Sequence, residues 1–169
     1  MPPLARKYTI QTWNHNPILR AHSEIIEEIT PELASFCEDM IKLMWKNKWV
    51  GLAAPQVGRN IRLITTTQWD QKHREDKFLG ETVMINPVIT ETSQEMVIWE
   101  EACISLPDVL GKVKRYKSIT VEYLDTKGHK QKKKLKDFNA VIVQHEIDHL
   151  DWVLFTDKLV KFGKNTKKL

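Results

Sequence analysis

The sequence predicts an α+β fold, in which mostly antiparallel strands pack around a buried C-terminal helix. Three observations support this prediction. An amphipathic stripe follows Pro31, several β-branched runs fill the middle of the chain, and a nearly all-apolar segment precedes His145. The 169 residues contain no internal repeat and no linker-like stretch, so residues 1–169 are expected to form a single domain.

The charge balance is mildly basic. Lysine and arginine outnumber aspartate and glutamate by 26 to 22, which gives a net charge of +4. Lysines are concentrated in residues 130–136 and in a basic C-terminal tail of roughly residues 158–169. We interpret both as solvated surface, with contact to RNA phosphates, and ribosome contact through the tail, as the alternative. The lysines are not interleaved with aromatic residues, so sequence-specific nucleic-acid binding is not expected.

Cysteine usage and hydropathy indicate the compartment. Two cysteines, Cys37 and Cys103, do not make a disulfide framework. No segment approaches the roughly 18 apolar residues of a membrane span, and no apolar run of signal-peptide length occurs at the N-terminus. We therefore expect a soluble, cytoplasmic protein with no membrane partner, and we leave an organellar form open.

The first predicted helix is amphipathic and follows an irregular segment over residues 1–23. Thr30 is a good N-cap, and Pro31 is a good first helical residue. Apolar residues then recur at helical spacing and form a stripe that faces a core. The stripe consists of Leu33, Phe36, Cys37, Met40, Ile41 and Met44. Because Cys37 lies within the stripe, we interpret it as a packing residue.

The middle of the chain is expected to be strand-rich. Residues 51–58 break the first helix and begin an extended region. The predicted strands cover residues 61–67, 83–86, 88–90 and 95–99, and a hairpin of residues 119–124 and 130–135 turns at Lys127-Gly128. Residues 68–80 are polar and predict a loop.

The last predicted helix is apolar on nearly every side. Asp137 is its expected N-cap, and the apolar positions are Phe138, Ala140, Val141, Ile142, Val143, Ile147 and Leu150. Such a helix lies in a core. Burying polar side chains on it is costly unless they are paired or bound to a metal ion.

Residues 145–149 carry the pattern H-E-x-x-H on that helix. His145 and His149 are four residues apart, so both imidazoles can reach one divalent metal ion. Glu146 can then hold a water molecule at the metal ion and take its proton. The pattern also occurs by chance, so the interpretation depends on finding a third ligand.

The third ligand is expected upstream of the motif. No glutamate, histidine or cysteine follows His149, and a catalytic site of this kind usually has three protein ligands. Cys103 is the outstanding candidate. The other histidines lie in polar, loop-like surroundings and are not expected to bind metal: His15, His22, His73 and His129.

Three motifs together resemble those of the peptide deformylase family. They are Gly51-Leu-Ala-Ala-Pro-Gln56, Glu101-Ala-Cys-Ile-Ser105 and Gln144-His-Glu-Ile-Asp-His149. Their order and separations also fit, and the resemblance covers about residues 10–160. It implies a hydrolase that removes the formyl group from the N-terminal formyl-methionine of newly made polypeptides.

The resemblance implies a metal ion held by Cys103, His145 and His149. Family members generally use Fe(II), and nickel, cobalt or zinc can substitute. Glu146 is then the general base and acid. The Gln56 side-chain amide and the Ile104 backbone N–H are the implied donors to the oxyanion of the intermediate. Asp148 and Gln144 flank the ligands and are candidates for hydrogen bonding or for orienting the site, but the sequence does not identify the acceptor that a histidine ligand needs.

A second group of residues is expected to contact the substrate. Gly51, with Val50 beside it, leaves room for the substrate backbone, and Ala102 flanks the expected groove. Val141 and Ile142 share a helix face with His145, so they are candidates for the wall of an apolar side-chain pocket, although core packing explains them equally well.

Four positions depart from the family pattern, because other residues replace common glycines. These are Trp49, Ala102, Asp137 and Trp152. None removes a ligand, the base or the glutamine, so we expect hydrolysis to be retained, and Trp49 and Ala102 leave the substrate preference open. Two alternatives stay open: a zinc peptidase, and a catalytically idle relative that binds peptide N-termini or ribosomes.

Overall fold

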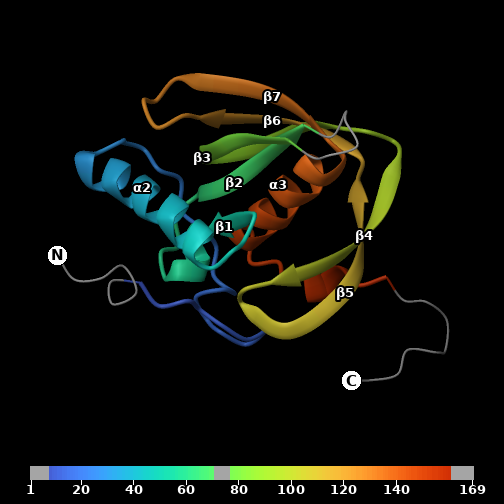
Figure 1. Ribbon diagram of the computed structural model, residues 1–169. Helices are drawn as coiled ribbons and strands as arrows, with labels where there is room; N and C mark the ends of the chain where they lie inside the picture. The colour runs from blue at the N-terminus through green and yellow to red at the C-terminus, as the bar shows by residue number, and fades with distance from the viewer. Residues whose placement is uncertain (1–7, 71–76, 161–169) are drawn as a thin grey trace.

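The computed structural model describes residues 8–70 and 77–160 of the chain. Within these residues, strands form two antiparallel sheets, and two α-helices pack with them (Figure 1). The expected α+β class with mostly antiparallel strands and a C-terminal helix is confirmed. The five-stranded sheet has the order β1-β2-β3-β6-β7, with bounds Gly51–Ala53, Leu63–Asp70, Lys77–Thr92, Ser118–Leu124 and Lys130–Lys136.

The second sheet is a two-stranded ribbon of β4 and β5, over Met96–Cys103 and Leu106–Tyr116. The α-helices are α2 over Pro31–Lys46 and α3 over Asp137–Leu150. Two short 3-10 helices, η1 and η2, cover Ala54–Val57 and Phe155–Lys158. In Figure 1, α3 runs between the larger sheet and the ribbon.

The larger sheet lies between the two helices because its side chains alternate between its faces. Leu63 and Ile85 face α2, and their neighbours Ile64 and Met84 face α3. All four are fully buried. The structure therefore has a core on each side of the sheet, and the core under α3 is the one next to the metal-binding motif.

Helix α2 begins as expected. The hydroxyl of Thr30 accepts a hydrogen bond from the backbone N–H of Leu33 at 3.2 Å, and Pro31 is the first helical residue. Its buried residues are Leu33, Phe36, Cys37, Met40, Leu43 and Met44. Ile41, which was expected in the stripe, is only partly buried against the same core.

Two predicted short strands, residues 83–86 and 88–90, are parts of the single strand β3. Its pairing with β6 shifts between Ile85 and Val88, because Pro87 has no N–H to donate. Asn86 has φ +51° there, and its side chain exchanges two hydrogen bonds with the backbone of Ile26. The proline interrupts the ladder without ending the strand.

The loop predicted over residues 68–80 is wrong at both ends. Strand β2 continues to Asp70 and β3 begins at Lys77, while residues 71–76 lie outside the described part of the chain. Trp69 pairs with Phe78 across the hairpin, and their ring centroids are 5.4 Å apart. Cross-strand aromatic pairing thus stabilises strand ends whose polar composition indicated a loop.

The β4–β5 ribbon was only partly anticipated. The predicted strand over residues 95–99 extends to Cys103, and no strand was predicted over β5. Gly111 and several exposed charged residues weaken the strand signal of β5. The ribbon is held to the rest of the structure partly by Val113, which forms a β-bridge with Leu159. Cys103 consequently lies at the end of β4.

The hairpin of β6 and β7 matches its prediction closely, and Gly128 in its turn has φ +82°. Helix α3 follows, but its expected N-cap is wrong. The cap position belongs to Lys136, no side chain caps the helix, and Asp137 is the first helical residue with φ +48°. An N-cap residue needs an extended backbone, which Asp137 does not have.

Candidate metal centre and cleft

Three side chains with metal-binding atoms converge at the junction of α3 and β4. The ligand atoms of Cys103, His145 and His149 all lie within 4.8 Å of one another. The Cys103 Sγ is 3.3 Å from Nε2 of His149, and the two imidazole centroids are 5.0 Å apart. Cys103 and His149 are 3% and 1% exposed. The described residues therefore bring together the three ligands that the sequence indicated.

This donor set fits a tetrahedral divalent ion. Metal–sulfur and metal–nitrogen distances of about 2.3 and 2.1 Å put the ligand atoms roughly 3.6 Å apart, close to the observed separation of Cys103 and His149. Burial lowers the pKa of His149 well below its usual value, and the charge of His145 lowers it further. His149 is therefore neutral, which is the form that binds a metal ion.

His145 is held differently. Burial lowers the pKa of His145, but hydrogen bonds with Cys103 and Glu101 outweigh burial and raise the pKa well above its usual value. Its Nδ1 is 2.8 Å from a carboxylate oxygen of Glu101. A cation that binds His145 must displace a proton, so metal binding at this centre is coupled to proton release.

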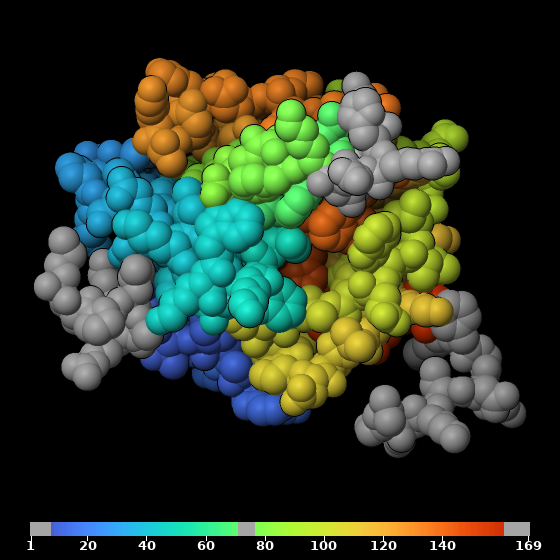
Figure 2. All heavy atoms as spheres, viewed as in Figure 1, coloured from blue at the N-terminus to red at the C-terminus, as the bar shows by residue number. Residues whose placement is uncertain are grey.

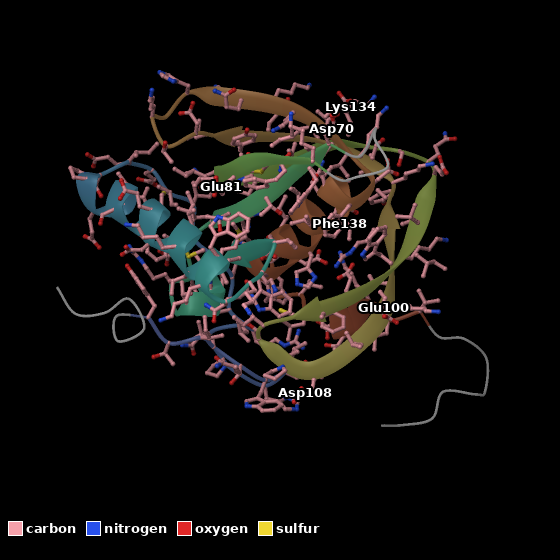
Figure 3. The ribbon with its side chains drawn as sticks, in the orientation of Figure 1. Asp70, Glu81, Glu100, Asp108, Lys134 and Phe138 are labelled. Atoms are coloured by element: carbon pink, nitrogen blue, oxygen red, sulfur yellow. The ribbon has the colours of Figure 1, made fainter. Side chains whose placement is uncertain are left out.

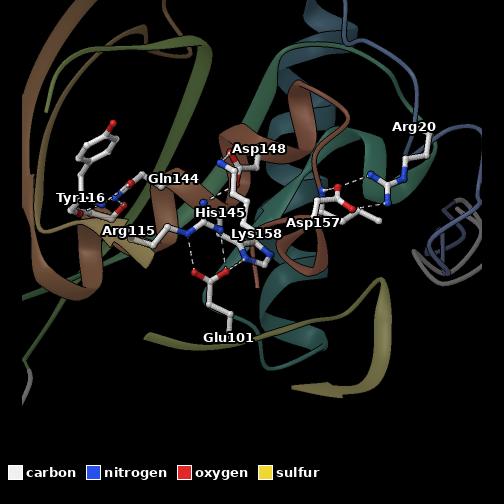
Figure 4. A network of polar contacts seen from close by, with 11 residues as sticks. Arg20, Glu101, Arg115, Tyr116, Gln144, His145, Asp148, Asp157 and Lys158 are labelled. Carbon is white, nitrogen blue, oxygen red and sulfur yellow. Dashed lines mark hydrogen bonds and ion pairs between the residues drawn. The ribbon is translucent and has the colours of Figure 1, made fainter. Parts of the chain in front are cut away.

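Glu101 belongs to a buried network that the sequence did not reveal (Figure 4). Arg115, itself 2% exposed, donates from Nε and Nη2 to the two Glu101 oxygens at 2.7 and 2.9 Å. Its Nη1 donates to Asp148, which also accepts from Lys158 at 2.7 Å. Burial raises the pKa of Glu101, but the bonds from Arg115 and His145 outweigh it and lower the pKa to about 2.

Both residues that flank the ligands form hydrogen bonds, as the sequence left open, but the structure records none from them to His145 or His149. Asp148 contacts Arg115 and Lys158. Gln144 exchanges hydrogen bonds with the backbone N–H and C=O of Tyr116 at 3.0 and 2.8 Å, so it fastens α3 to the end of β5. The acceptor for the histidine is Glu101, the first residue of the cysteine motif.

Glu146 is buried beside the three ligands. Its Oε2 has no hydrogen-bond partner among the described residues. Burial is the largest of the effects that raise its pKa to about 7. A Cβ added to Gly51 would lie 2.4 Å from Glu146 Oε1, so the absence of a side chain at residue 51 is what leaves room for this carboxylate.

Gln56, on η1, is fixed with its amide nitrogen toward the centre. Its Oε1 accepts a hydrogen bond from the backbone N–H of Ala53 at 2.8 Å. Its Nε2 is then 3.3 Å from Cys103 Sγ and 3.2 Å from the Ser105 hydroxyl. The acceptor role of Oε1 decides which end of the amide points inward.

A cleft with an empty volume of about 600 Å³ opens onto this centre. Figure 2 shows it as a hollow between the surface around residue 50 and that of β4, with α3 at its floor. It is lined by ten of the eleven residues nominated from the sequence: Val50, Gly51, Gln56, Ala102, Cys103, Ile104, Val141, Ile142, His145 and Glu146. His149 lies beneath them.

The remaining lining residues were not nominated as site residues. They are Trp49, Trp99, Glu100, Glu101 and Phe138. Trp99 and Phe138 stack with ring centroids 5.4 Å apart and an interplanar angle of 24°. Helical spacing could have found Phe138, which is seven residues before His145 and shares its face. Trp99 had no comparable signal.

The other histidines do not join the centre. His15 and His129 are exposed, and His22 packs edge-on against Trp152 with ring centroids 5.0 Å apart. His73 lies outside the described residues. Across the described residues, the group of Cys103, His145 and His149 is therefore the candidate metal centre.

Comparisons with known proteins agree with one another. A family model described as polypeptide deformylase matches residues 7–165. The peptide deformylase of Finegoldia magna is 39% identical over 150 residues, which cover 89% of this chain and 88% of that protein. The peptide deformylase of Helicobacter hepaticus is 40% identical over 163 residues, which cover 91% and 87%.

Solved structures give the same result. A probable peptide deformylase from Synechococcus phage S-SSM7 superposes with a TM-score of 0.80 at 39% identity, covering 90% of this chain and 99% of that one. A class I type b peptide deformylase from Acinetobacter baumannii, solved with Met-Ala-Ser bound, superposes with a TM-score of 0.83 at 31% identity. That match covers 90% of this chain and 98% of the other.

Proposed function

The chain belongs to the polypeptide deformylase family, and from this premise we propose which of its groups carry out the removal of the formyl group. The protein is a metal-dependent hydrolase that acts on the formylated N-termini of newly made polypeptides. Water supplies the nucleophile, and the formyl C–N bond breaks to give formate and a free amine. The roles assigned below rest on the geometry of the cleft.

Cys103, His145 and His149 hold the metal ion in this proposal. Their convergence within 4.8 Å and their burial support the assignment. The ion supplies two kinds of chemistry when bound, because it lowers the pKa of a water molecule and polarises a carbonyl oxygen. Fe(II) is the proposed native ion, and nickel, cobalt or zinc can substitute at a site with two imidazoles and one thiolate.

Glu146 is the general base and acid. Its carboxylate lies in the cleft with one oxygen free of hydrogen bonds, so that oxygen can accept a proton from the attacking water. A carboxyl group with a pKa of about 7 exchanges protons readily near neutral pH. Glu146 then delivers the proton to the amine nitrogen as the C–N bond breaks, which balances the reaction.

Gln56 and Ile104 stabilise the negative oxygen that develops on the formyl group. The bond from the Ala53 N–H to the Gln56 carbonyl oxygen holds Gln56 Nε2 toward the cleft, and one of its N–H groups, which now face Cys103 Sγ and the Ser105 hydroxyl, would turn to the oxyanion. The Ile104 backbone N–H is the second proposed donor, from a residue that lines the same cleft. One such donor contributes about 3 kcal/mol to lowering the barrier.

The substrate backbone enters between β1 and β4. Val50 and Gly51 line one side of the cleft and Ala102 lines the other. Strand β1 is at the edge of the larger sheet, and β4 pairs only with β5 among the described strands, so each has a free edge for hydrogen bonding. Val141 and Ile142 form part of the wall against the side chain of the first residue.

The broader assignments are also proposals. Residues 1–169 form one deformylase domain with a basic tail from about residue 158, which the family match over residues 7–165 supports. The bacterial relatives support a cytoplasmic location. The described helices include none with the length and apolar character to cross a bilayer. Ribosome contact by the tail concerns residues 161–169, which lie outside the described part of the chain.

The single observation that carries the proposal is the convergence of Cys103, His145 and His149 beside the buried Glu146. We would measure formate release from formyl-Met-Ala-Ser by protein loaded anaerobically with Fe(II) or Ni(II). The wild type should release formate, and Glu146→Ala should bind metal but release formate only at a small residual rate. Cleavage of an unformylated peptide would instead favour a zinc peptidase, and tight formyl-peptide binding without turnover would favour an idle relative.

A further inference from the structure

Three aromatic side chains form a row on the surface outside the cleft. The ring centroids of Trp69 on β2 and Phe78 on β3 are 5.4 Å apart, and those of Phe78 and Trp45 on α2 are 5.3 Å apart. Trp45 and Phe78 are 41% and 40% exposed, and the neighbouring Leu79 is 60% exposed. Figure 2 shows the surfaces of the end of α2 and the start of β3 side by side next to the hollow. Exposed apolar groups that are gathered in this way mark interaction sites, whereas singly scattered ones do not.

The row begins at the rim of the cleft. The backbone C=O of Val50, which lines the cleft, accepts hydrogen bonds from the backbone N–H and the hydroxyl of Thr67. The Trp69 indole N–H donates to the same hydroxyl at 2.8 Å. The Asn139 side chain exchanges hydrogen bonds with the backbone of Trp69 at 3.0 and 2.7 Å, and Asn139 follows the lining residue Phe138. Trp69 is therefore fixed beside one wall of the cleft and beside α3.

The rings offer apolar surface to a partner, because both indole N–H groups in the row are already used. Trp69 donates to Thr67, and Trp45 Nε1 donates to a carboxylate oxygen of Glu81 at 2.6 Å. Glu81 lies on β3 close to α2 (Figure 3). Contact with aromatic rings depends on the apolar area that is buried and not on a particular hydrogen-bond pattern. Such a surface suits a partner whose sequence varies from one molecule to the next.

The direction of the substrate chain leads to this row. The reacting groups lie beside Cys103, the last residue of β4, and the cleft extends from there along β4 and α3 to Phe138. Phe138 is seven residues before His145, or about 10 Å along the helix axis. An extended chain covers about 10 Å in three residues. The fourth residue of a substrate whose formyl group is at the centre is therefore the first to leave the cleft, and it leaves beside Trp69.

We propose that Trp45, Trp69 and Phe78 form a docking surface for the part of the nascent polypeptide that follows its first three residues. This inference rests on the proposed function and deepens it, because it extends the recognised substrate from a formylated N-terminus to a longer segment of chain. The occupant is the downstream part of the substrate itself, since the row is continuous with the cleft that holds the N-terminus. The docking surface binds the chain and takes no part in proton transfer.

The test compares formyl-Met-Ala-Ser with formyl-Met-Ala-Ser-Leu-Phe-Leu and formyl-Met-Ala-Ser-Gly-Ser-Gly. The wild type should deformylate the peptide with the apolar extension at a kcat/KM about three- to tenfold above that of the other two, the ratio that burial of roughly 30 to 55 Å² of apolar surface corresponds to. The gain should appear as a lower KM at unchanged kcat, because these contacts are the same in the ground state and the transition state.

Surface variants identify the residues responsible. Trp45→Ser and Phe78→Ser should each lower the ratio of kcat/KM between the apolar extended peptide and formyl-Met-Ala-Ser, and the double variant should remove most of it. Trp152→Ser removes a tryptophan of similar exposure, 48% against 41% for Trp45, which packs with His22 outside the row. It should keep the wild-type ratio. Unfolded molecules and lost metal lower both rates equally and cancel in the ratio, and the two single variants lie on different elements, so the test stays informative if one of them folds poorly.

The possible failures are distinguishable. If the wild type treats the three peptides alike, or if the serine variants keep its ratio, the row only stabilises the fold, and the inference is overturned while the deformylase function stands. The same conclusion follows if Trp152→Ser lowers the ratio as much as Trp45→Ser does. If metal-loaded wild type releases no formate from any of the peptides, the proposed function itself fails.

Discussion

Gly51 and Glu146 meet so closely that the Cβ which Gly51 lacks would lie 2.4 Å from the Glu146 Oε1. From the sequence, Gly51 was expected to leave room for the substrate backbone. The structure adds a requirement internal to the protein, because any side chain on β1 at this point would push the carboxylate away from the three metal-binding atoms. The first prediction follows from this contact.

Gly51→Ala should lower kcat/KM for formyl-Met-Ala-Ser by about 100-fold, the cost of misplacing a catalytic group by about 1 Å. A double-mutant cycle with Glu146→Ala checks the cause. When Glu146 is already absent, adding Gly51→Ala should have little further effect. An undiminished effect in that background would mean that Gly51 acts on the substrate and not on Glu146. Thermal unfolding of each variant controls for loss of fold.

The second prediction concerns acid stability. The pKa of Glu101 is about 2 in the folded protein against 4.5 as its ordinary value. The depressed pKa stabilises the fold fully above about pH 5, and this contribution is lost as the pH falls toward 2. The loss amounts to roughly 3 kcal/mol. Urea unfolding of metal-free protein across this range measures it.

Glu101→Gln should flatten that acid-side slope, whatever its effect on absolute stability. Glu100→Gln, on the adjacent exposed side chain, is the matched control and should keep the wild-type slope. Equal slopes in all three proteins would contradict the assignment of the buried ion pair with Arg115 as the source of the acid sensitivity.

The third prediction concerns two of the positions where the chain departs from the family glycines. Asp137 is the first residue of α3 and Trp152 follows its end, and both have left-handed backbones, with φ of +48° and +52°. At either position the glycine variant should be more stable than the alanine variant by about 1 kcal/mol, because only residues with a Cβ are strained there. Denaturant unfolding of the four variants measures this difference.

Both variants lack the native side chain, so the difference in their free energies of unfolding reports the strain of the left-handed backbone. At Lys42, an exposed position inside α2, the order should reverse, with alanine more stable than glycine by about 1 kcal/mol. If alanine is also the better residue at positions 137 and 152, the left-handed conformations cost nothing and the missing glycines are neutral substitutions.

The fourth prediction concerns metal removal. A bound ion should protect the thiol of Cys103, and chelation should let a disulfide reagent react with Cys103 through the cleft that it lines. Cys37 should react far more slowly, because it is packed in the core under α2 and burial raises its pKa to about 11. Reaction rates of Cys37→Ser and Cys103→Ser, with and without chelator, assign each thiol.

The opposite result is easily recognised. If chelation leaves the rate of thiol modification unchanged, Cys103 does not hold the ion. If the fast thiol disappears in Cys37→Ser and persists in Cys103→Ser, the two cysteines have exchanged the roles that we assign to them.

Local patterns explain which parts could be predicted from the sequence. The cap at Thr30, the turn at Gly128 and the spacing of His145 and His149 are all set within a few residues, so periodicity and turn chemistry found them. Strand β5 and the true ends of β2 and β3 depend on cross-strand partners, such as Trp69 with Phe78, which composition does not reveal.

The same distinction holds for the site. The motif positions were found because residue types and spacing carry their chemistry. Arg115 was missed, since an arginine among lysines on an unpredicted strand gives no sign that it will be buried between Glu101 and Asp148. Trp99 was missed because its partner Phe138 is distant in sequence. Both depend on contacts between β4, β5 and α3 that only the fold creates.

The β4–β5 ribbon has a consequence for folding energetics. Among the described strands, β4 and β5 pair only with each other, so the ribbon joins the rest of the protein through side chains, the bridge of Val113 with Leu159, and the chain itself. We therefore expect the ribbon to open as a unit at a free energy below that of global unfolding. Cys103 and Glu101 tie it to α3, so occupancy of the centre should govern amide hydrogen exchange along the whole ribbon. The β4 side of the cleft is thereby stabilised by Cys103 and Glu101, the same residues that hold the metal ion and orient His145 in the proposed reaction.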